Sequence, residues 1–139
     1  MNKEDKELLL KDLCARLPYG VICEYTSIQD GLEIRNEIGK LTAIDKDVSG
    51  CKHIYAKIDG HLIGLSDFKP YLRQMYSMTE DEQHEYNLIA MHTIVTSKGF
   101  VHIEATDLID WLNAHYFDYR GLIDRGLAIE VTEQNNPYN

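Results

Sequence analysis

The chain has 139 residues, of which 44% are hydrophobic and 27% are charged, which is the size and composition of an ordinary globular domain. No apolar run approaches the roughly 18 residues of a membrane helix, and the first residues do not form a secretory signal, so we expect a cytoplasmic protein without a membrane segment. The net charge of −9 is uneven, because residues 79–139 hold 11 acidic and 3 basic side chains against 12 and 11 in residues 1–78. This imbalance disfavours binding of nucleic acid through the second half, since phosphate groups are neutralised by Lys and Arg.

The first half of the chain predicts one helix followed by short strands. Leucines recur at helical spacing within residues 4–16, and Pro18 ends that run. Asp-Gly pairs at residues 30–31 and 59–60 separate apolar runs, which is the strongest short-range signal for a hairpin because both turn residues tolerate positive φ. With "LEIRNEI" and "KLTAID" counted separately, we expect about five strands over residues 20–66, in a small antiparallel sheet or a partly closed barrel of the SH3-like or OB type.

The second half predicts helices separated by short strands, after an irregular connector over residues 66–78. Thr79 and Glu82 form a capping box at the start of a helix that Gly99 is placed to end. The elements expected next are a strand at residues 100–103, a helix over 106–116 with Thr106 as its N-cap, a short helix between Asp118 and Gly126, and a strand over 127–131. Up to its wing, this order resembles that of a winged-helix domain.

These elements predict an α+β protein. Its organisation is either a helix-and-sheet subdomain over residues 1–78 with an acidic helical subdomain over 79–139, or one integrated domain. Spacing and helix caps do not determine how the elements pack, so the sequence is compatible with both organisations.

Cysteine and histidine patterns predict neither a metal site nor a catalytic centre. Cys14, Cys23 and Cys51 include no CxxC pair and are most simply small buried hydrophobic residues. His102 and Glu104 have the spacing of the zinc deaminase signature, but that site also needs a Pro-Cys-x-x-Cys, and no Cys follows residue 51. The chain contains no P-loop, GxGxxG or GxSxG motif. We therefore expect no cofactor, no metal ion and no catalytic residue, and an enzyme is the least favoured class.

A first candidate binding stretch is "FKPYLRQMY" in the connector. Tyr71 lies between two basic residues, Lys69 and Arg73, and such a mixture can stack on and neutralise a single-stranded nucleic acid. The favoured alternative is that this connector packs between the two halves of the chain.

A second candidate is "WLNAHYFDYRG", which concentrates aromatic rings. Trp111, His115, Tyr119 and Arg120 have the composition of a protein-binding hot spot. The alternative is that the stretch is core, as the helical spacing of its neighbours Leu112 and Tyr116 indicates and as a single Trp usually is.

At "DFKPYLRQMYSMTEDEQHEY" and "DWLNAHYFDYRGLIDRGLAIE" the chain resembles a family of small proteins encoded in prophages and other mobile elements of gut Bacteroidetes. The matching segments are Lys69–Arg73, Ser77–Glu82, Asp110–Asn113 and Phe117–Ile129, together with residues 8–21. The chain departs from the family pattern in two places: at Gln74, where members usually have Pro, and in the ending "TEQNNPYN". The resemblance implies a bacterial, phage-associated context, and since the family brings no established activity, no catalytic residue is carried over.

Three hypotheses for function follow. The first is a non-enzymatic interaction module that binds an unknown protein partner through the aromatic surface around Trp111, Tyr116 and Tyr119. The second is a nucleic-acid-associated regulator with a winged-helix-like or OB/SH3-like part, and the third is an acidic decoy that mimics DNA and occupies a DNA-binding protein.

Overall fold

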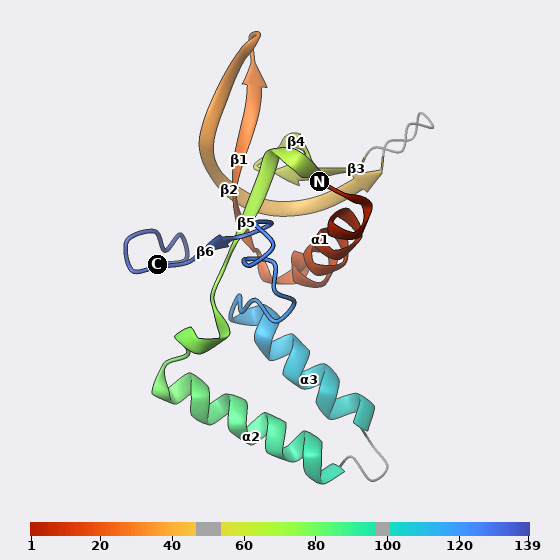
Figure 1. The fold of residues 1–139 in the computed structure, drawn as a ribbon, viewed down its shortest axis with the longest axis vertical. Coiled ribbons are helices and arrows are strands. Elements are labelled where there is room, and N and C mark those ends of the chain that lie inside the picture. Colours follow the sequence, from red (N-terminus) through yellow and green to blue (C-terminus); the bar gives the residue numbers. More distant parts are fainter. Residues whose placement is uncertain (47–53, 97–100) are drawn as a thin grey trace.

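The computed structural model describes residues 1–46, 54–96 and 101–139, which form a sheet, a helix packed against it and a helical hairpin that projects from it (Figure 1). The helices are α1 (Lys3–Arg16), α2 (Glu80–Thr96) and α3 (Val101–Ala114), with short 3-10 turns at Leu17–Tyr19, Leu65–Asp67 and Met75–Ser77. The strands are β1 (Ile22–Gln29), β2 (Leu32–Lys46), β3 (Ile54–Ile58), β4 (His61–Gly64), β5 (Phe68–Leu72) and β6 (Ile129–Glu130). The protein is therefore of the α+β class, as the sequence predicts.

The described strands form one sheet in the order β4-β3-β2-β1-β5-β6. Neighbouring strands are antiparallel except β5 and β6, which run parallel, with Tyr71 opposite Ile129 and Leu72 opposite Glu130. Of the two arrangements that the sequence predicts, the structure has the small sheet, antiparallel except at β6, and not the partly closed barrel, because the sheet is open. The last strand adds beside β5 while β4 ends the opposite edge, so no pairing joins the two edges.

Both Asp-Gly pairs form the predicted hairpin turns. Asp30 and Gly31 have φ of 53° and 78°, and Asp59 and Gly60 have φ of 50° and 84°, as two-residue turns of the primed type require. Gln29 pairs with Leu32 across the first turn, and Ile58 pairs with His61 across the second. The turn residues therefore set the register of both hairpins.

The strand count in this half differs from the expected one. "LEIRNEI" and "KLTAID" form the single strand β2, which runs through the buried Gly39 and carries a register shift between Leu41 and Ala43. The predicted connector contains β5, although Pro70 removes a donor there. β5 pairs with three residues of β1, with Pro70 opposite Cys23, and its pairing with β6 begins at Tyr71.

The second half departs further from the predicted order. Val101–Ile103 begin α3 instead of forming a strand, so Thr106 lies inside that helix and the helix-strand-helix order of a winged-helix domain is absent. Residues 119–126 form turns rather than a helix, and Gly121, inside the expected helix, adopts a left-handed φ of 75°. Of the predicted strand 127–131, only the two residues of β6 pair. Cys51, Gly99 and Phe100 and the side chains of His102 and Glu104 lie outside the described residues.

The core lies between α1, one face of the sheet and the C-terminal segment. α1 begins at Lys3, where Asn2 accepts a hydrogen bond from the Asp5 backbone N–H at 2.7 Å, and it buries Leu9 and Leu13 completely. The remaining fully buried or nearly buried core residues come from both halves of the chain: Val21, Cys23, Tyr25, Leu41, Ala56, Ile58, Ile63, Leu65, Phe68, Leu72, Leu122, Leu127 and Ala128. Within the described residues, no helix is long and apolar enough to cross a membrane.

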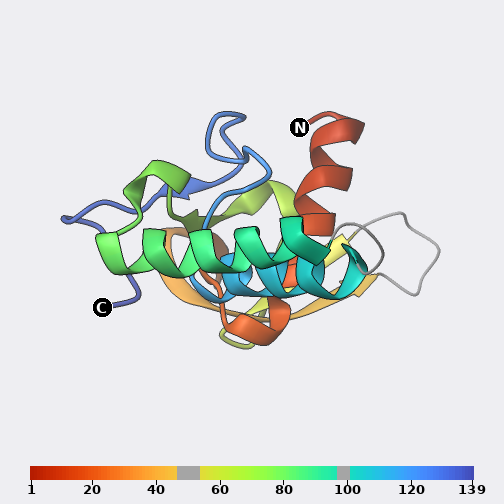
Figure 2. The ribbon, with the colours of Figure 1, turned by 90° about the horizontal axis from the view of Figure 1, so that it is seen from below.

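Two elements extend away from this core in opposite directions (Figure 1). The first is the end of the β1–β2 hairpin, which continues beyond the residues that pair with β5 and β3. The second is the α2–α3 hairpin, which lies below the sheet in Figure 1 and whose two helices run side by side (Figure 2). Ile28 and Leu32 on the first extension, and Leu88 and Met91 on the second, are mainly exposed.

Candidate functional site

The α2–α3 hairpin joins the rest of the molecule at a cluster of five side chains, Arg73, Glu82, Trp111, His115 and Phe117, which we call the hairpin foot. Phe117 is fully buried, and the guanidinium carbon of Arg73 lies 4.2 Å from the centre of its ring. Trp111 stacks on His115 with 4.2 Å between ring centres and on Phe117 with 5.7 Å. The indole Nε1 donates to Glu85 on α2 at 3.0 Å. Trp111 is therefore half-buried and joins α3 to α2.

The charges at the hairpin foot are paired with each other. Arg73 donates to both carboxylate oxygens of Glu82, from Nη1 at 2.7 Å and from Nη2 at 2.6 Å. Glu82 also completes the predicted capping box, accepting from the Thr79 backbone N–H at 3.0 Å while Thr79 Oγ1 accepts from the Glu82 N–H at 3.1 Å. The hydrogen bonds from Arg73 lower the pKa of Glu82 to about 2, with Thr79 adding to the effect against the opposing influence of burial. This carboxylate is ionised at neutral pH and anchors the start of α2.

A second cluster, the α1 junction, consists of Asp12, Arg16, Asn113, Tyr119 and Arg120. Asp12 and Arg16 are fully buried and joined by Arg16 Nε donating to Asp12 Oδ2 at 2.7 Å. Arg16 Nη2 also donates to the carbonyl of Phe117 at 2.7 Å, and Arg120 Nε lies 3.4 Å from Asp12 Oδ1. Both guanidinium carbons lie 5.1 Å from the centre of the Tyr119 ring, whose hydroxyl donates to Asn113 at 2.8 Å. This cluster fixes α1 to the segment that follows α3.

The six side chains that the sequence suggests as binding residues therefore lie in three places. Arg73, Trp111 and His115 meet at the hairpin foot, and Tyr119 and Arg120 belong to the α1 junction. Tyr71 is buried in β5, where its carbonyl accepts a hydrogen bond from Tyr138 at 2.8 Å.

Tyr116, the third aromatic residue of the hypothesised interaction surface, is also held inside the molecule. Its ring stacks on Tyr138 with 3.7 Å between ring centres, and its hydroxyl donates to the carbonyl of Tyr19 at 2.9 Å. Asp118 accepts from the backbone N–H groups of Leu122 and Ile123, each at 2.9 Å, and so stabilises the turns that follow.

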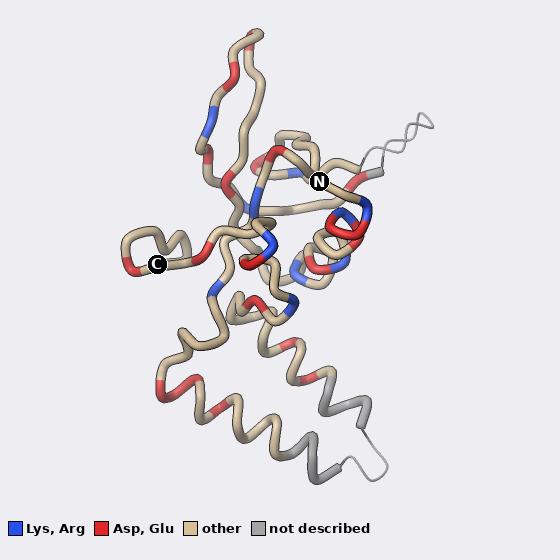
Figure 3. The backbone as a smooth tube through the Cα atoms, viewed as in Figure 1, with Lys and Arg blue, Asp and Glu red and all other residues tan. Residues whose placement is uncertain are grey.

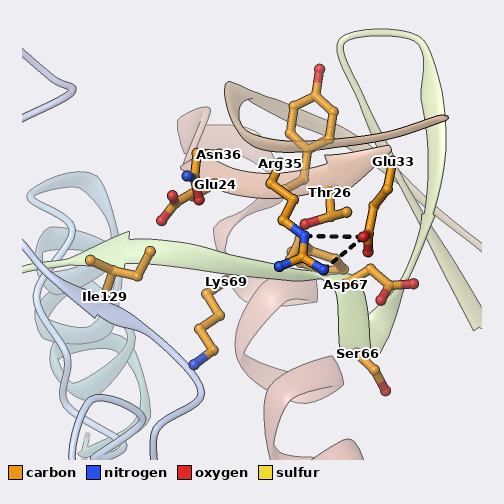
Figure 4. Close-up of a pocket in the computed structure, with 11 residues that line it drawn as sticks. Glu24, Thr26, Glu33, Arg35, Asn36, Ser66, Asp67, Lys69 and Ile129 are labelled. Carbon is orange, nitrogen blue, oxygen red and sulfur yellow. Dashed lines mark hydrogen bonds and ion pairs between the residues drawn. The ribbon is translucent and has the colours of Figure 1, made fainter. Parts of the chain in front are cut away.

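A hollow lies on the sheet beside the β1–β2 hairpin (Figure 4). Its volume is about 510 Å³, and its charged lining consists of Glu24, Glu33, Arg35, Asp67 and Lys69. Arg35 points into the hollow and donates to Glu33 from Nε at 3.1 Å and from Nη2 at 2.7 Å. Acids and bases are thus mixed in this polar hollow, and its lining contains no His or Cys.

A smaller cavity of about 360 Å³ adjoins the hairpin foot. Arg73, Glu82 and His115 line it together with Tyr116 and Tyr138. Its charged groups are those already joined in the Arg73–Glu82 pair.

Two of the cysteines, Cys14 and Cys23, lie among the described residues. Cys23 is buried, which raises the pKa of its thiol, whereas Cys14 lies on the solvent side of α1, contrary to the expectation that it is buried. Among the described residues, no three His, Cys, Asp or Glu side chains come close enough to hold a metal ion.

The α2–α3 hairpin carries a surface that the sequence reasoning did not single out. On α2, Leu88 is 54% exposed and Met91 is 60% exposed, and on α3 Ile109 is 37% exposed. A helix places residues three apart on one face, so Leu88 and Met91 are neighbours. One signal in the sequence could have indicated this surface. The apolar residues of α2 occupy more of the helix circumference than a single neighbouring helix covers, so some of them must stay exposed.

Acidic side chains accompany this apolar pair. Neither α2 nor α3 contains Lys or Arg, and both carry acidic residues along their length (Figure 3). These include Glu80, Asp81 and Glu85 on α2 and Asp107 and Asp110 on α3. Glu85 already accepts a hydrogen bond from Trp111, and Asp110 is hydrogen-bonded to Tyr19. We call Leu88, Met91, Glu80, Asp81 and Asp107 the hairpin surface. It combines exposed apolar side chains with charge of a single sign.

Comparison with protein-family models, with curated proteins and with solved structures finds no match to this chain.

Proposed function

We propose that the protein is a non-enzymatic interaction module that binds another protein through its α2–α3 hairpin. The observation that carries this proposal is the exposure of Leu88 and Met91 on a helix none of whose described side chains, from residue 80 to 91, is fully buried. Adjacent exposed apolar side chains on a projecting element, bordered by polar ones, are typical of protein-binding surfaces.

The aromatic residues take a supporting role in this proposal. Trp111 joins the two helices by a hydrogen bond to Glu85 on α2. Its ring also stacks on Phe117, which belongs to the body of the protein. Tyr116 and Tyr119 each use their hydroxyl in an intramolecular hydrogen bond. These contacts hold the hairpin in position, and the partner is bound by side chains further along it.

The third hypothesis, an acidic decoy that mimics DNA, is the second candidate. The absence of Lys and Arg from α2 and α3 favours it, because a row of acids can imitate phosphates. The exposed Leu88 and Met91 favour the interaction module instead, since a phosphate backbone offers no counterpart to them. The phage or mobile-element context remains a prediction from the sequence resemblance.

Site-specific crosslinking and capture test the proposed function. A photo-crosslinking amino acid at position 87, on the exposed side of α2, should join the chain to one protein in a lysate of the organism that encodes it. The double variant Leu88→Ser/Met91→Ser should lose that product. A matched control, Ile28→Ser/Leu32→Ser, removes residues that are 78% and 70% exposed on the β1–β2 hairpin and should keep it.

The hairpin proposal is wrong if both double variants give the same crosslinked product. It is also wrong if the product appears only when the photo-crosslinker stands on the β1–β2 hairpin.

A further inference from the structure

We infer that the partner of the hairpin surface is a basic amphipathic helix, which lies along the exposed face of α2 as a third helix beside α2 and α3. This inference rests on the proposed function and adds the chemistry of the partner to it. It is carried by the apolar pair on α2 and by the sign of the charges around it.

The apolar part of the surface suits a helix. α2 packs against α3, and Glu85 and Tyr86 are on the side that meets Trp111. Leu88 and Met91 are not covered by α3. They lie three positions apart, which is the spacing of the apolar residues by which two helices pack together. Residues 80–91 of α2 extend about 18 Å at the helical rise of about 1.5 Å per residue, so the face matches about three turns of a partner helix.

The charged part of the surface selects the sign of the partner. Glu80, Asp81 and Asp107 form no ion pair with any residue that the structure describes. Glu82, by contrast, is satisfied by Arg73 at the hairpin foot. Lys and Arg beside the apolar stripe of the partner would pair with the open carboxylates, and charge complementarity of this kind directs association and excludes wrong partners.

The same charges disfavour the other occupants. A second copy of this chain would place one acidic hairpin against another, and like charges at an interface oppose association. A nucleic acid or an anionic membrane would meet carboxylates where it needs Lys and Arg. A basic helix is the occupant that satisfies both the apolar pair and the acids.

The test uses the full chain and a synthetic helical peptide of about 18 residues, with Leu at helical spacing on one face and Lys on the other. One control peptide carries Glu in place of every Lys, and a second has the composition of the Lys peptide in a scrambled order that destroys the apolar face. Trp111 is the only Trp in the chain and lies between the two helices, so its fluorescence reports on binding at the hairpin. Isothermal titration calorimetry gives the Kd.

We expect the Lys peptide to bind saturably, and both control peptides to bind at least about tenfold more weakly. Leu88→Ser/Met91→Ser should weaken binding of the Lys peptide by about tenfold or more, as loss of two partly buried apolar side chains implies. Raising the salt concentration should weaken it several-fold. Ile28→Ser/Leu32→Ser should leave the Kd unchanged.

Four results would overturn the inference. They are failure of the Lys peptide to bind, equal binding of the Lys and Glu peptides, a concentration-dependent dimer in analytical ultracentrifugation that Leu88→Ser/Met91→Ser abolishes, and a change in Trp111 fluorescence with DNA or anionic vesicles. If any of these occurs while the crosslinked product still depends on Leu88 and Met91, the proposed function stands and only the chemistry of the partner is wrong. If the crosslinked product is independent of Leu88 and Met91, the proposed function itself fails.

Discussion

α1 and α2 are helices of similar length that meet opposite environments. α1 has 14 residues and buries Leu9, Asp12, Leu13 and Arg16, because the sheet lies on one side of it and the segment after α3 on another. α2 has 17 residues, and none of its described side chains is fully buried. The difference shows that the number of packed neighbours, more than the composition of a helix, decides whether its apolar residues become core.

The charges of the two helices follow the same division. In α1 the Asp12–Arg16 pair is fully buried and bonded to the Phe117 carbonyl, so it connects residues far apart in the chain. In α2, Glu80 and Asp81 face solvent and complement the helix dipole at its start. We therefore expect changes in α1 to cost stability and changes on the outer face of α2 to affect binding.

The largest expected effect comes from Arg16→Met. Met keeps apolar volume but leaves Asp12 buried beside a single guanidinium, Arg120, at 3.4 Å, and it leaves the Phe117 carbonyl without its donor. Breaking a buried pair from one side usually costs about 3–5 kcal/mol. Urea unfolding followed by circular dichroism should show a loss of this size in the free energy of unfolding. A loss below about 1 kcal/mol would mean that Arg120 alone compensates Asp12.

A smaller, pH-dependent effect is expected at the hairpin foot. The pKa of Glu82 is about 2 in the folded protein against its ordinary 4.5, so folding favours the ionised carboxylate. The stability that this difference contributes is fully present above pH 4.5 and is lost as the pH falls from 4.5 towards 2. At about 1.4 kcal/mol per pKa unit, it amounts to at most about 3.5 kcal/mol.

The variant Glu82→Gln tests this contribution. Gln can still accept from the Thr79 N–H in the capping box, so the change mainly removes the ionic bond to Arg73. Urea unfolding between pH 2 and pH 6 should give a flatter pH dependence for Glu82→Gln than for the wild type. Glu80→Gln, in the same helical turn, should keep the wild-type slope, and equal slopes for all three proteins would contradict the assignment.

Local signals in the sequence predicted the parts of the fold that local chemistry decides. The Asp-Gly turns and the capping box at Thr79 and Glu82 formed as expected, because each depends on residues within four positions of one another. Val101–Ile103 and β5 were misassigned, since the first run joins α3 and the second pairs with β1 through contacts distant in sequence. Parallel pairing of β6 with β5 is equally a long-range property.

The candidate site shows the same limit. Composition drew attention to Trp111 and Tyr119, but the hydrogen bonds of Trp111 to Glu85 and of Tyr119 to Asn113 are contacts that no spacing rule supplies. Leu88 and Met91 belong to a broad run of apolar residues in α2, and their spacing does not indicate which of these residues stay exposed. Only the tertiary arrangement shows which side of α2 has a neighbour.

The smallest expected effect on stability, and the sharpest test of the comparison between α1 and α2, comes from Leu88→Ser/Met91→Ser. Because both side chains are mainly exposed, their loss should change the free energy of unfolding by no more than about 0.5 kcal/mol each. Leu13→Ala, on the buried face of α1, should cost about 2–5 kcal/mol in the same urea titration. Equal losses at the two positions would mean that the outer face of α2 belongs to the core. A large loss at Leu13 with almost none at Leu88 and Met91 would mean that those two apolar residues contribute little to folding, as the proposed binding role requires.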